Sequence, residues 1–216
     1  MPRESLAKKK ARAIEIIERL RREYPDARCS LDFETPHQLM VATILSAQCT
    51  DERVNMVTPA LFEKYRNVKA FAEADQKELE KDIYTTGFYS NKAKSIRGSA
   101  QQLLDEHGGE IPKTLDELVK LPGVGRKTAS VILGVGFGLA EGVVVDTHVT
   151  RISRLLGLTA AREPLKIERD LMKTVPKESW IDFSHLLIFH GRAVCVARRP
   201  QCAECCLAEL CPSVKL

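Results

Sequence analysis

The chain has 216 residues, of which 44% are hydrophobic and 29% are charged. This composition is typical of a globular protein, and the length suffices for one domain or two small ones. No apolar run reaches the roughly 20 residues of a membrane span, and the charged N-terminus lacks the apolar core of a signal peptide. These features exclude a membrane protein and a secreted protein, so we expect a cytoplasmic location. The formal net charge of +4 permits a polyanionic partner without requiring one.

The first half of the chain has helical periodicity throughout. Thr35 followed by Pro36 is typical of an N-cap and the first residue of a helix. Asp51 is the expected cap of the next long helix, and Gly108 with Gly109 is a typical helix stop. The helices expected here cover residues 5–24, 36–45, 52–65, 69–83 and 89–107.

The second half continues in the same way. Asp146 or Thr147 is expected to cap a helix that runs to Leu156. The only strand-like stretch, residues 143–145, is too short to indicate a sheet, so the sequence predicts an all-α fold. The further expected helices cover residues 114–120, a segment after the glycines at 123 and 125, residues 164–174 and residues 178–194.

A glycine-rich turn, residues 121–125, separates two of these short helices. Gly123 and Gly125 allow backbone conformations that a side chain would block. Such a turn can aim consecutive N–H groups at a phosphate at the start of the next helix, although a plain tight turn fits the same residues. Arg126 and Lys127 follow in the first helical turn, where the helix dipole disfavours cations. Their presence there indicates that the charges have a use.

Five of the seven cysteines lie in the last 22 residues. This crowding indicates a local metal site in a reducing compartment rather than a disulfide framework. Four of them, Cys195, Cys202, Cys205 and Cys211, have intervals of six, two and five residues, and Cys206 is additional. Four thiolates suit either zinc or a [4Fe–4S] cluster, and the chemistry alone does not separate the two.

Several segments together resemble one family. LPGVGRKTA (121–129) and VDTHVTRISRLLGL (145–158) closely resemble the helix–hairpin–helix and catalytic segment of endonuclease III, a DNA glycosylase and abasic-site lyase with an iron–sulfur cluster. LSAQCTD (45–51), GFYSNKA (87–93) and the terminal cysteines also resemble family segments in the same order. The resemblance extends over nearly the whole chain.

The resemblance implies a role for particular residues. Lys127 is the expected nucleophile and Asp146 the expected catalytic carboxylate. Gln48 is expected to fill the gap left by a flipped nucleotide, and Phe88 to act as a wedge in a position that is often aliphatic in the family. The remaining expected DNA contacts are Gly123, Val124, Gly125, Arg126, His148, Arg198 and Arg199. The [4Fe–4S] ligands are expected to be Cys195, Cys202, Cys205 and Cys211.

The resemblance also implies an architecture and a substrate. It predicts two helical lobes with a DNA-binding cleft, one formed by residues 28–139 and the other by 1–27 with 140–216. The expected partner of this monomer, associated with the nucleoid, is double-stranded DNA with oxidised pyrimidines such as thymine glycol, or with abasic sites. Alternatives are an adenine-specific or thymine-specific mismatch glycosylase, a non-enzymatic DNA-binding module and a zinc-stabilised interaction protein. The presence of Lys127 argues against the adenine-specific enzyme.

Overall fold

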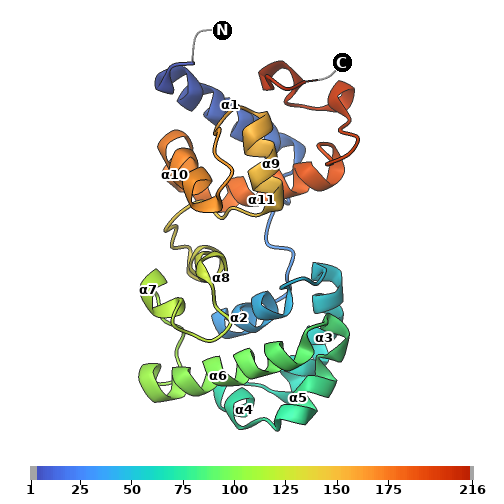
Figure 1. Ribbon diagram of the computed structural model, residues 1–216, viewed down its shortest axis with the longest axis vertical. Helices are drawn as coiled ribbons and strands as arrows, with labels where there is room; N and C mark the ends of the chain where they lie inside the picture. Colours follow the sequence, from blue (N-terminus) through green and yellow to red (C-terminus); the bar gives the residue numbers. More distant parts are fainter. Residues whose placement is uncertain (1–3, 215–216) are drawn as a thin grey trace. The chain divides into compact units, whose positions relative to one another are not determined.

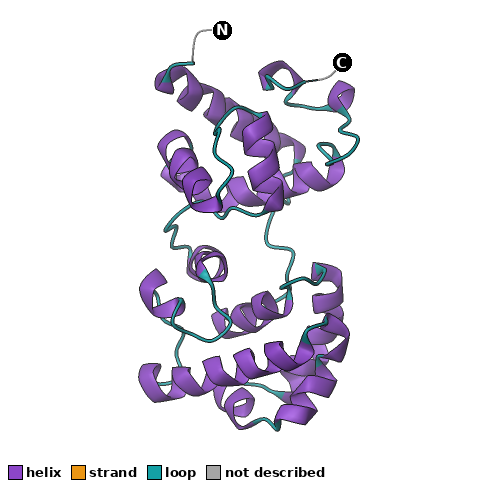
Figure 2. Ribbon diagram, viewed as in Figure 1, coloured by secondary structure: helices purple, strands orange, loops and turns teal. Residues whose placement is uncertain are grey.

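The structure is a computed structural model that describes residues 4–214. Every regular element in this range is a helix, and no strand occurs in it (Figure 2). Residues 143–145 are irregular chain. The prediction of an all-α fold is therefore confirmed. None of the helices in the described range has the length and apolar character needed to cross a bilayer.

The chain forms two compact units, each with its own hydrophobic core. The central unit is the continuous stretch Cys29–Leu139, and the terminal unit joins the described residues up to Arg28 to those from Ala140 onward. Met40, Phe71 and Ile96 are completely buried in the core of the central unit. Ile16 and Phe183 are completely buried in the core of the terminal unit.

The central unit is built around one long helix, α6, against which α4 and α5 pack and which α2 also contacts (Figure 1). Apolar residues recur on the inner side of α6 every three or four positions, which explains why this helix is central. The elements of this unit are α2 (Pro36–Leu45), α3 (Asp51–Lys64), α4 (Val68–Glu73), α5 (Gln76–Asp82), the 3₁₀ turn η1 (Tyr84–Thr86), α6 (Tyr89–His107), α7 (Leu115–Leu118), α8 (Arg126–Val131) and the π-helical turn η2 (Ile132–Gly136).

The single helix expected over residues 69–83 was wrong, because the structure has two helices and a 3₁₀ turn there. Ala74 leaves the helical region with φ −57° and ψ 138°. Asp75 then caps α5, since its side chain accepts a hydrogen bond from the Glu78 N–H at 2.9 Å. An aspartate that offers its own acceptor to the backbone favours a helix start over helix continuation.

The expected cap at Asp51 was also wrong. Thr50 is the N-cap of α3, and its hydroxyl accepts the Arg53 N–H at 3.2 Å. Asp51 is the first helical residue, where its negative charge interacts favourably with the helix dipole. Both residue types are good caps, so the pattern alone did not decide between neighbours.

The terminal unit packs α1 on α10 and α11, and α9 on α11 (Figure 1). Between α11 and residue 214, the regular elements of this unit are short 3₁₀ turns only. The helix expected over residues 178–194 starts as a 3₁₀ turn and becomes α-helical at Trp180. The elements of this unit are α1 (Leu6–Glu23), α9 (Thr147–Leu155), α10 (Pro164–Thr174), η3 (Lys177–Ser179), α11 (Trp180–Ala193), η4 (Cys202–Glu204) and η5 (Ala208–Leu210).

Candidate functional site

The glycine-rich turn forms a tight hairpin between α7 and α8 in the central unit. The Val124 N–H donates to the Leu121 carbonyl at 3.0 Å, and Val124 is almost completely buried. The hairpin is fixed on α6, because the Ser99 hydroxyl donates to the Pro122 carbonyl at 2.5 Å. The buried Val124 side chain and the Pro122 carbonyl therefore anchor the turn to the central unit.

The two glycines of the hairpin have different requirements. Gly123 has φ +77°, and a Cβ there would lie 2.6 Å from Ser95 Cβ on α6. Gly125 has an ordinary φ of −80°, so the expectation that its conformation requires glycine was wrong. A Cβ on Gly125 would meet nothing within 4 Å. Gly123 is needed for packing within the chain, whereas Gly125 leaves open space beside the start of α8.

Arg126 and Lys127 lie in the first turn of α8, and both are exposed. Gly125, the N-cap of α8, provides no side chain to accept the first N–H groups of the helix. Those N–H groups and the two cations together favour an anion at this end. Lys127 is thus a solvent-accessible amine beside an anion-attracting turn.

Asp146 belongs to the terminal unit and is the N-cap of α9. Its Oδ1 accepts the Val149 N–H at 2.7 Å. The side chain is only partly buried, and a carboxylate has more acceptor positions than this one bond uses. Capping fixes the direction of the carboxylate without exhausting its capacity to accept or stabilise charge.

His148 is the second residue of α9 and packs closely on α11. A Cβ on Gly191 would lie 2.5 Å from His148 Nδ1, so glycine gives the imidazole its space. Arg151 Nη2 lies 3.3 Å from the same Nδ1. Burial lowers the pKa of His148, while the charge of Asp146 opposes that shift. The neutral imidazole is therefore favoured.

Gln48 and Phe88 are exposed, and each follows the end of a helical element in the central unit. Gln48 has φ +53° and Phe88 has φ +47°, and they are the only non-glycine residues in the described range with positive φ. A left-handed conformation costs such residues about 1–2 kcal/mol. Phe88 is 62% exposed, which excludes core packing as its role. Strain combined with exposure is typical of residues selected for a function.

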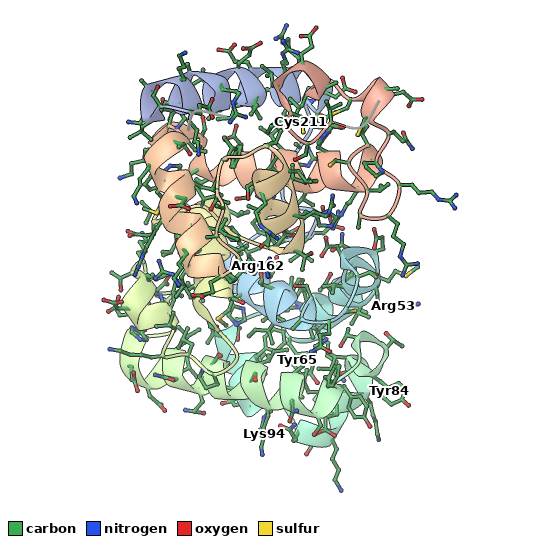
Figure 3. All side chains as sticks on the ribbon, turned by 45° about the horizontal axis from the view of Figure 1, so that its top comes forward. Arg53, Tyr65, Tyr84, Lys94, Arg162 and Cys211 are labelled. Atoms are coloured by element: carbon green, nitrogen blue, oxygen red, sulfur yellow. The ribbon has the colours of Figure 1, made fainter. Side chains whose placement is uncertain are left out.

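The four spaced cysteines border one cavity of about 310 Å³ in the terminal unit. Cys195 follows α11, Cys202 begins η4, Cys205 follows η4 and Cys211 follows η5. Cys206 does not line the cavity. All four lining residues are free thiols, and Figure 3 labels Cys211 on the C-terminal segment. The four cysteines at intervals of six, two and five residues therefore line the same cavity.

Polar groups contact three of these sulfurs, and Cys211 Sγ donates to the Leu155 carbonyl at 3.7 Å. The Leu207 N–H donates to Cys205 Sγ at 3.4 Å, and His190 Nε2 lies 3.5 Å from the same atom. Arg151 Nη1 lies 3.7 Å from Cys195 Sγ and also donates to the Cys195 carbonyl. Hydrogen bonds of this kind stabilise thiolates and tune a bound cluster. In the loop between Cys195 and Cys202, Arg198 and Arg199 are exposed.

Sequence reasoning missed Lys92, a buried cation on α6. It is 5% exposed, and its Nζ donates to the carbonyls of Leu45 and Thr86. Its burial could have been predicted from the sequence, because position 92 lies on the inner face of the expected helix with Ile96 and Leu103. His190 and Arg151 were missed as well, because nothing in their spacing relates them to the cysteines.

Comparisons with known proteins agree with these features. The family described as HhH-GPD superfamily base excision DNA repair protein matches residues 41–177. The chain is 57% identical to endonuclease III of Synechocystis sp., with 97% of this chain and 96% of the relative covered. It is 39% identical to endonuclease III of Escherichia coli, with 94% and 95% covered.

Solved structures give the same result. A trapped covalent intermediate of endonuclease III with DNA has a TM-score of 0.88 and 44% identity, over 94% of this chain and 96% of that chain. A thermostable thymine-DNA glycosylase has a TM-score of 0.83 at 22% identity, over 97% and 99%, and shares the fold. With the family match and these relatives extending over most of its length, the chain belongs to the endonuclease III family, within the HhH-GPD superfamily of base excision DNA repair proteins.

Proposed function

We propose that this DNA glycosylase of base excision repair is bifunctional. It removes oxidised pyrimidines such as thymine glycol and then cleaves the strand on the 3′ side of the abasic site. The observation that carries the proposal is the exposed Lys127 amine in the first turn of α8, directly after the hairpin built on Gly123. The hairpin attracts a backbone phosphate and contacts no base. It can therefore hold DNA of any sequence next to the Lys127 amine.

Lys127 acts as the nucleophile in this scheme. The neutral amine forms a bond to C1′ of the deoxyribose, and the damaged base leaves with the electron pair of the glycosidic bond and takes up a proton. Loss of a proton from nitrogen and opening of the sugar ring give an imine between Lys127 and C1′. The protonated imine acidifies the C2′ hydrogen, and removal of this proton breaks the C3′–O bond, so that the downstream strand leaves with a 5′-phosphate terminus. Water then hydrolyses the imine and frees the lysine.

Asp146 is the proposed catalytic carboxylate. A negative charge stabilises the positive charge that develops on the sugar as the base leaves. A carboxylate also accepts and returns protons during imine formation. The bond from Val149 to Asp146 Oδ1 holds the carboxylate in one orientation for these steps.

Gln48 and Phe88 are the proposed residues for reaching the base. A base in duplex DNA is accessible only after its nucleotide is flipped out, at a cost of a few kcal/mol. Gln48 fills the gap and contacts the unpaired base, and the Phe88 ring stacks between bases as a wedge. Their left-handed conformations present both side chains at exposed bends of the chain. His148, Arg198 and Arg199 are proposed DNA contacts, the two arginines through phosphates.

A [4Fe–4S] cluster is the proposed occupant of the cysteine-lined cavity. The intervals of six, two and five residues between the cysteines resemble the iron–sulfur motif of the endonuclease III family, and this resemblance favours a cluster over zinc. The four thiols border one cavity of about 310 Å³, and four thiolates are the usual ligands of a [4Fe–4S] cluster. Cys195, Cys202, Cys205 and Cys211 would hold it. A cluster bound to these cysteines would stabilise the loop that carries Arg198 and Arg199.

Borohydride trapping tests this function. Reduction of the imine leaves a stable covalent complex between protein and DNA, which migrates slowly on a denaturing gel. We expect a complex with a thymine-glycol duplex for the wild type and its loss in Lys127→Gln. Lys120→Gln is the matched control, because Lys120 is also an exposed lysine beside the hairpin.

The other outcomes identify the alternatives. Base release without a trapped complex in the wild type would mean a monofunctional enzyme and would favour a mismatch glycosylase. Loss of the complex in both variants would show a general effect of charge near the hairpin and would contradict the nucleophile assignment. Binding without base release or a complex would contradict the proposed substrate.

A further inference from the structure

Lys92 connects the two chain segments that end in Gln48 and Phe88. The Lys92 Nζ donates to the Leu45 carbonyl at 2.7 Å and to the Thr86 carbonyl at 2.8 Å. Leu45 is the last residue of α2, three positions before Gln48. Thr86 is the last residue of η1, two positions before Phe88. One ammonium group thus joins the bases of both exposed bends.

Burying the Lys92 ammonium group costs free energy, because the charge loses its contact with water. Lys92 is 5% exposed, and burial lowers its pKa. Charged groups are rarely buried without compensation. Here the compensation is two short, charge-assisted hydrogen bonds, one of them to the C-terminal end of α2, where the helix dipole favours a cation. An apolar side chain would fill the same space without a buried charge that needs hydrogen-bond partners, so the two hydrogen bonds indicate a role for the ammonium group itself.

The two bends depend on backbone conformations that need external support. Gln48 and Phe88 both have positive φ, which their side chains disfavour. Such conformations persist when the surrounding structure fixes the chain on either side. The Lys92 ammonium bonds to the chain three residues before Gln48 and two residues before Phe88. The ring contact between Tyr84 and Tyr89, with centroids 4.8 Å apart, fixes the second bend from outside.

We propose that Lys92 is a positioning residue that holds Gln48 and Phe88 at a fixed separation, so that both enter the duplex at one base pair. The inference rests on the roles proposed above for these two residues. It assigns Lys92 no contact with DNA. Its effect should be confined to DNA that must be opened, because Ser95 and Ser99 of α6, and not Lys92, contact the hairpin that grips phosphates.

The test compares two duplexes. One contains tetrahydrofuran, an uncleavable abasic-site analogue, opposite 2-aminopurine, whose fluorescence rises when it is unstacked. The other is undamaged. In Lys92→Met we expect affinity for the tetrahydrofuran duplex to fall about tenfold or more, as for the loss of a charge-assisted hydrogen bond. The 2-aminopurine signal should fall with it, while affinity for the undamaged duplex stays unchanged.

Lys94→Met is the matched control. Lys94 lies on the same helix, is exposed, and points away from the bundle (Figure 3). It should behave as the wild type on both duplexes. If Lys92→Met does not fold, Lys92→Gln takes its place, because its amide keeps a polar group but lacks the charge and the reach to both carbonyls. Lys92→Arg, which keeps the charge and several donors, should restore part of the fluorescence signal.

A double-mutant cycle separates this inference from the proposed function. Gln48→Ala and Phe88→Ala are made alone and together with Lys92→Met, and non-additive losses are expected since Lys92 acts through these residues. If both alanine variants reduce the fluorescence signal but Lys92→Met does not, the positioning role is refuted while the roles of Gln48 and Phe88 stand. If neither alanine variant has an effect, those roles are refuted and the inference with them. Equal losses on both duplexes would mean a general structural role and would also overturn it.

Discussion

Alanine at Gly123 should lower the stability of the central unit, whereas alanine at Gly125 should lower the affinity for DNA, although the two glycines are only two residues apart. Gly123 has positive φ, and a Cβ there would lie 2.6 Å from Ser95 Cβ, a carbon that cannot rotate away because it is attached to the α6 backbone. We expect Gly123→Ala to destabilise the central unit by about 2–5 kcal/mol. Of this, about 1–2 kcal/mol comes from a left-handed alanine, and about 1–3 kcal/mol from overpacking against α6.

Gly125→Ala should cost less than about 1 kcal/mol of stability, since alanine is only a poorer N-cap than glycine. Its methyl group meets nothing in the chain and occupies the space where we place a DNA phosphate. Affinity for an undamaged duplex should therefore fall about tenfold, as for the loss of a charge-assisted hydrogen bond.

Hydrogen exchange of peptides from α6 to α8 measures the first effect region by region, and equilibrium binding to an undamaged duplex measures the second. Trp180, the only tryptophan, lies in the terminal unit and should report no change in either variant. Equal destabilisation by the two alanines would refute the packing argument for Gly123. Full affinity in Gly125→Ala would refute the phosphate grip at the start of α8.

Three further predictions concern stability and the metal site. Burial lowers the pKa of His37 to about 4, so as the pH falls the unfolded chain binds a proton at this histidine before the folded chain does. The free energy of unfolding should therefore be unaffected by His37 above about pH 6.5 and should decrease by up to about 3 kcal/mol as the pH approaches 4. Urea unfolding of wild type and His37→Leu at about pH 7 and pH 4.5 should show a smaller acid loss in the variant, and an equal loss would contradict this. Thr50→Ala should cost about 1 kcal/mol, more than Asp51→Ala, since Thr50 is the cap; the reverse order in thermal unfolding would restore Asp51 as the cap. Cys206→Ser should purify brown with the iron content of the wild type, whereas Cys205→Ser should lose iron, and iron loss in Cys206→Ser would show that the ligand set is wrong.

The long helices could be predicted because apolar residues recur at helical spacing over many turns, as in α1 and α6. The break before Asp75 could not be predicted in this way. Phe71, Leu79 and Ile83 continue an apolar face through it, although they belong to separate elements. The choice between Thr50 and Asp51 as the cap similarly depends on the direction of the side chain, which periodicity does not encode.

Some residues of the candidate site could likewise be predicted from the sequence, whereas other features of the site could not. Lys127 and the four cysteines stand in local motifs whose spacing is legible, so they could be singled out before any coordinates. The positive φ of Gln48 and Phe88 could not be predicted, because neither is glycine, the residue type that favours this conformation. The bond from Lys92 to the Leu45 carbonyl, 47 residues away, has no local signal in the sequence either. The discontinuous terminal unit was expected from family resemblance and has no marker in composition.

In the proposed mechanism, Lys127 becomes covalently attached to DNA during the reaction. The most direct measurement is mass spectrometry of the borohydride-reduced complex after digestion of both protein and DNA. We expect a sugar remnant on Lys127, within a peptide that trypsin fails to cut at this residue. A remnant on Lys120, on Lys92 or on the N-terminal amine would contradict it.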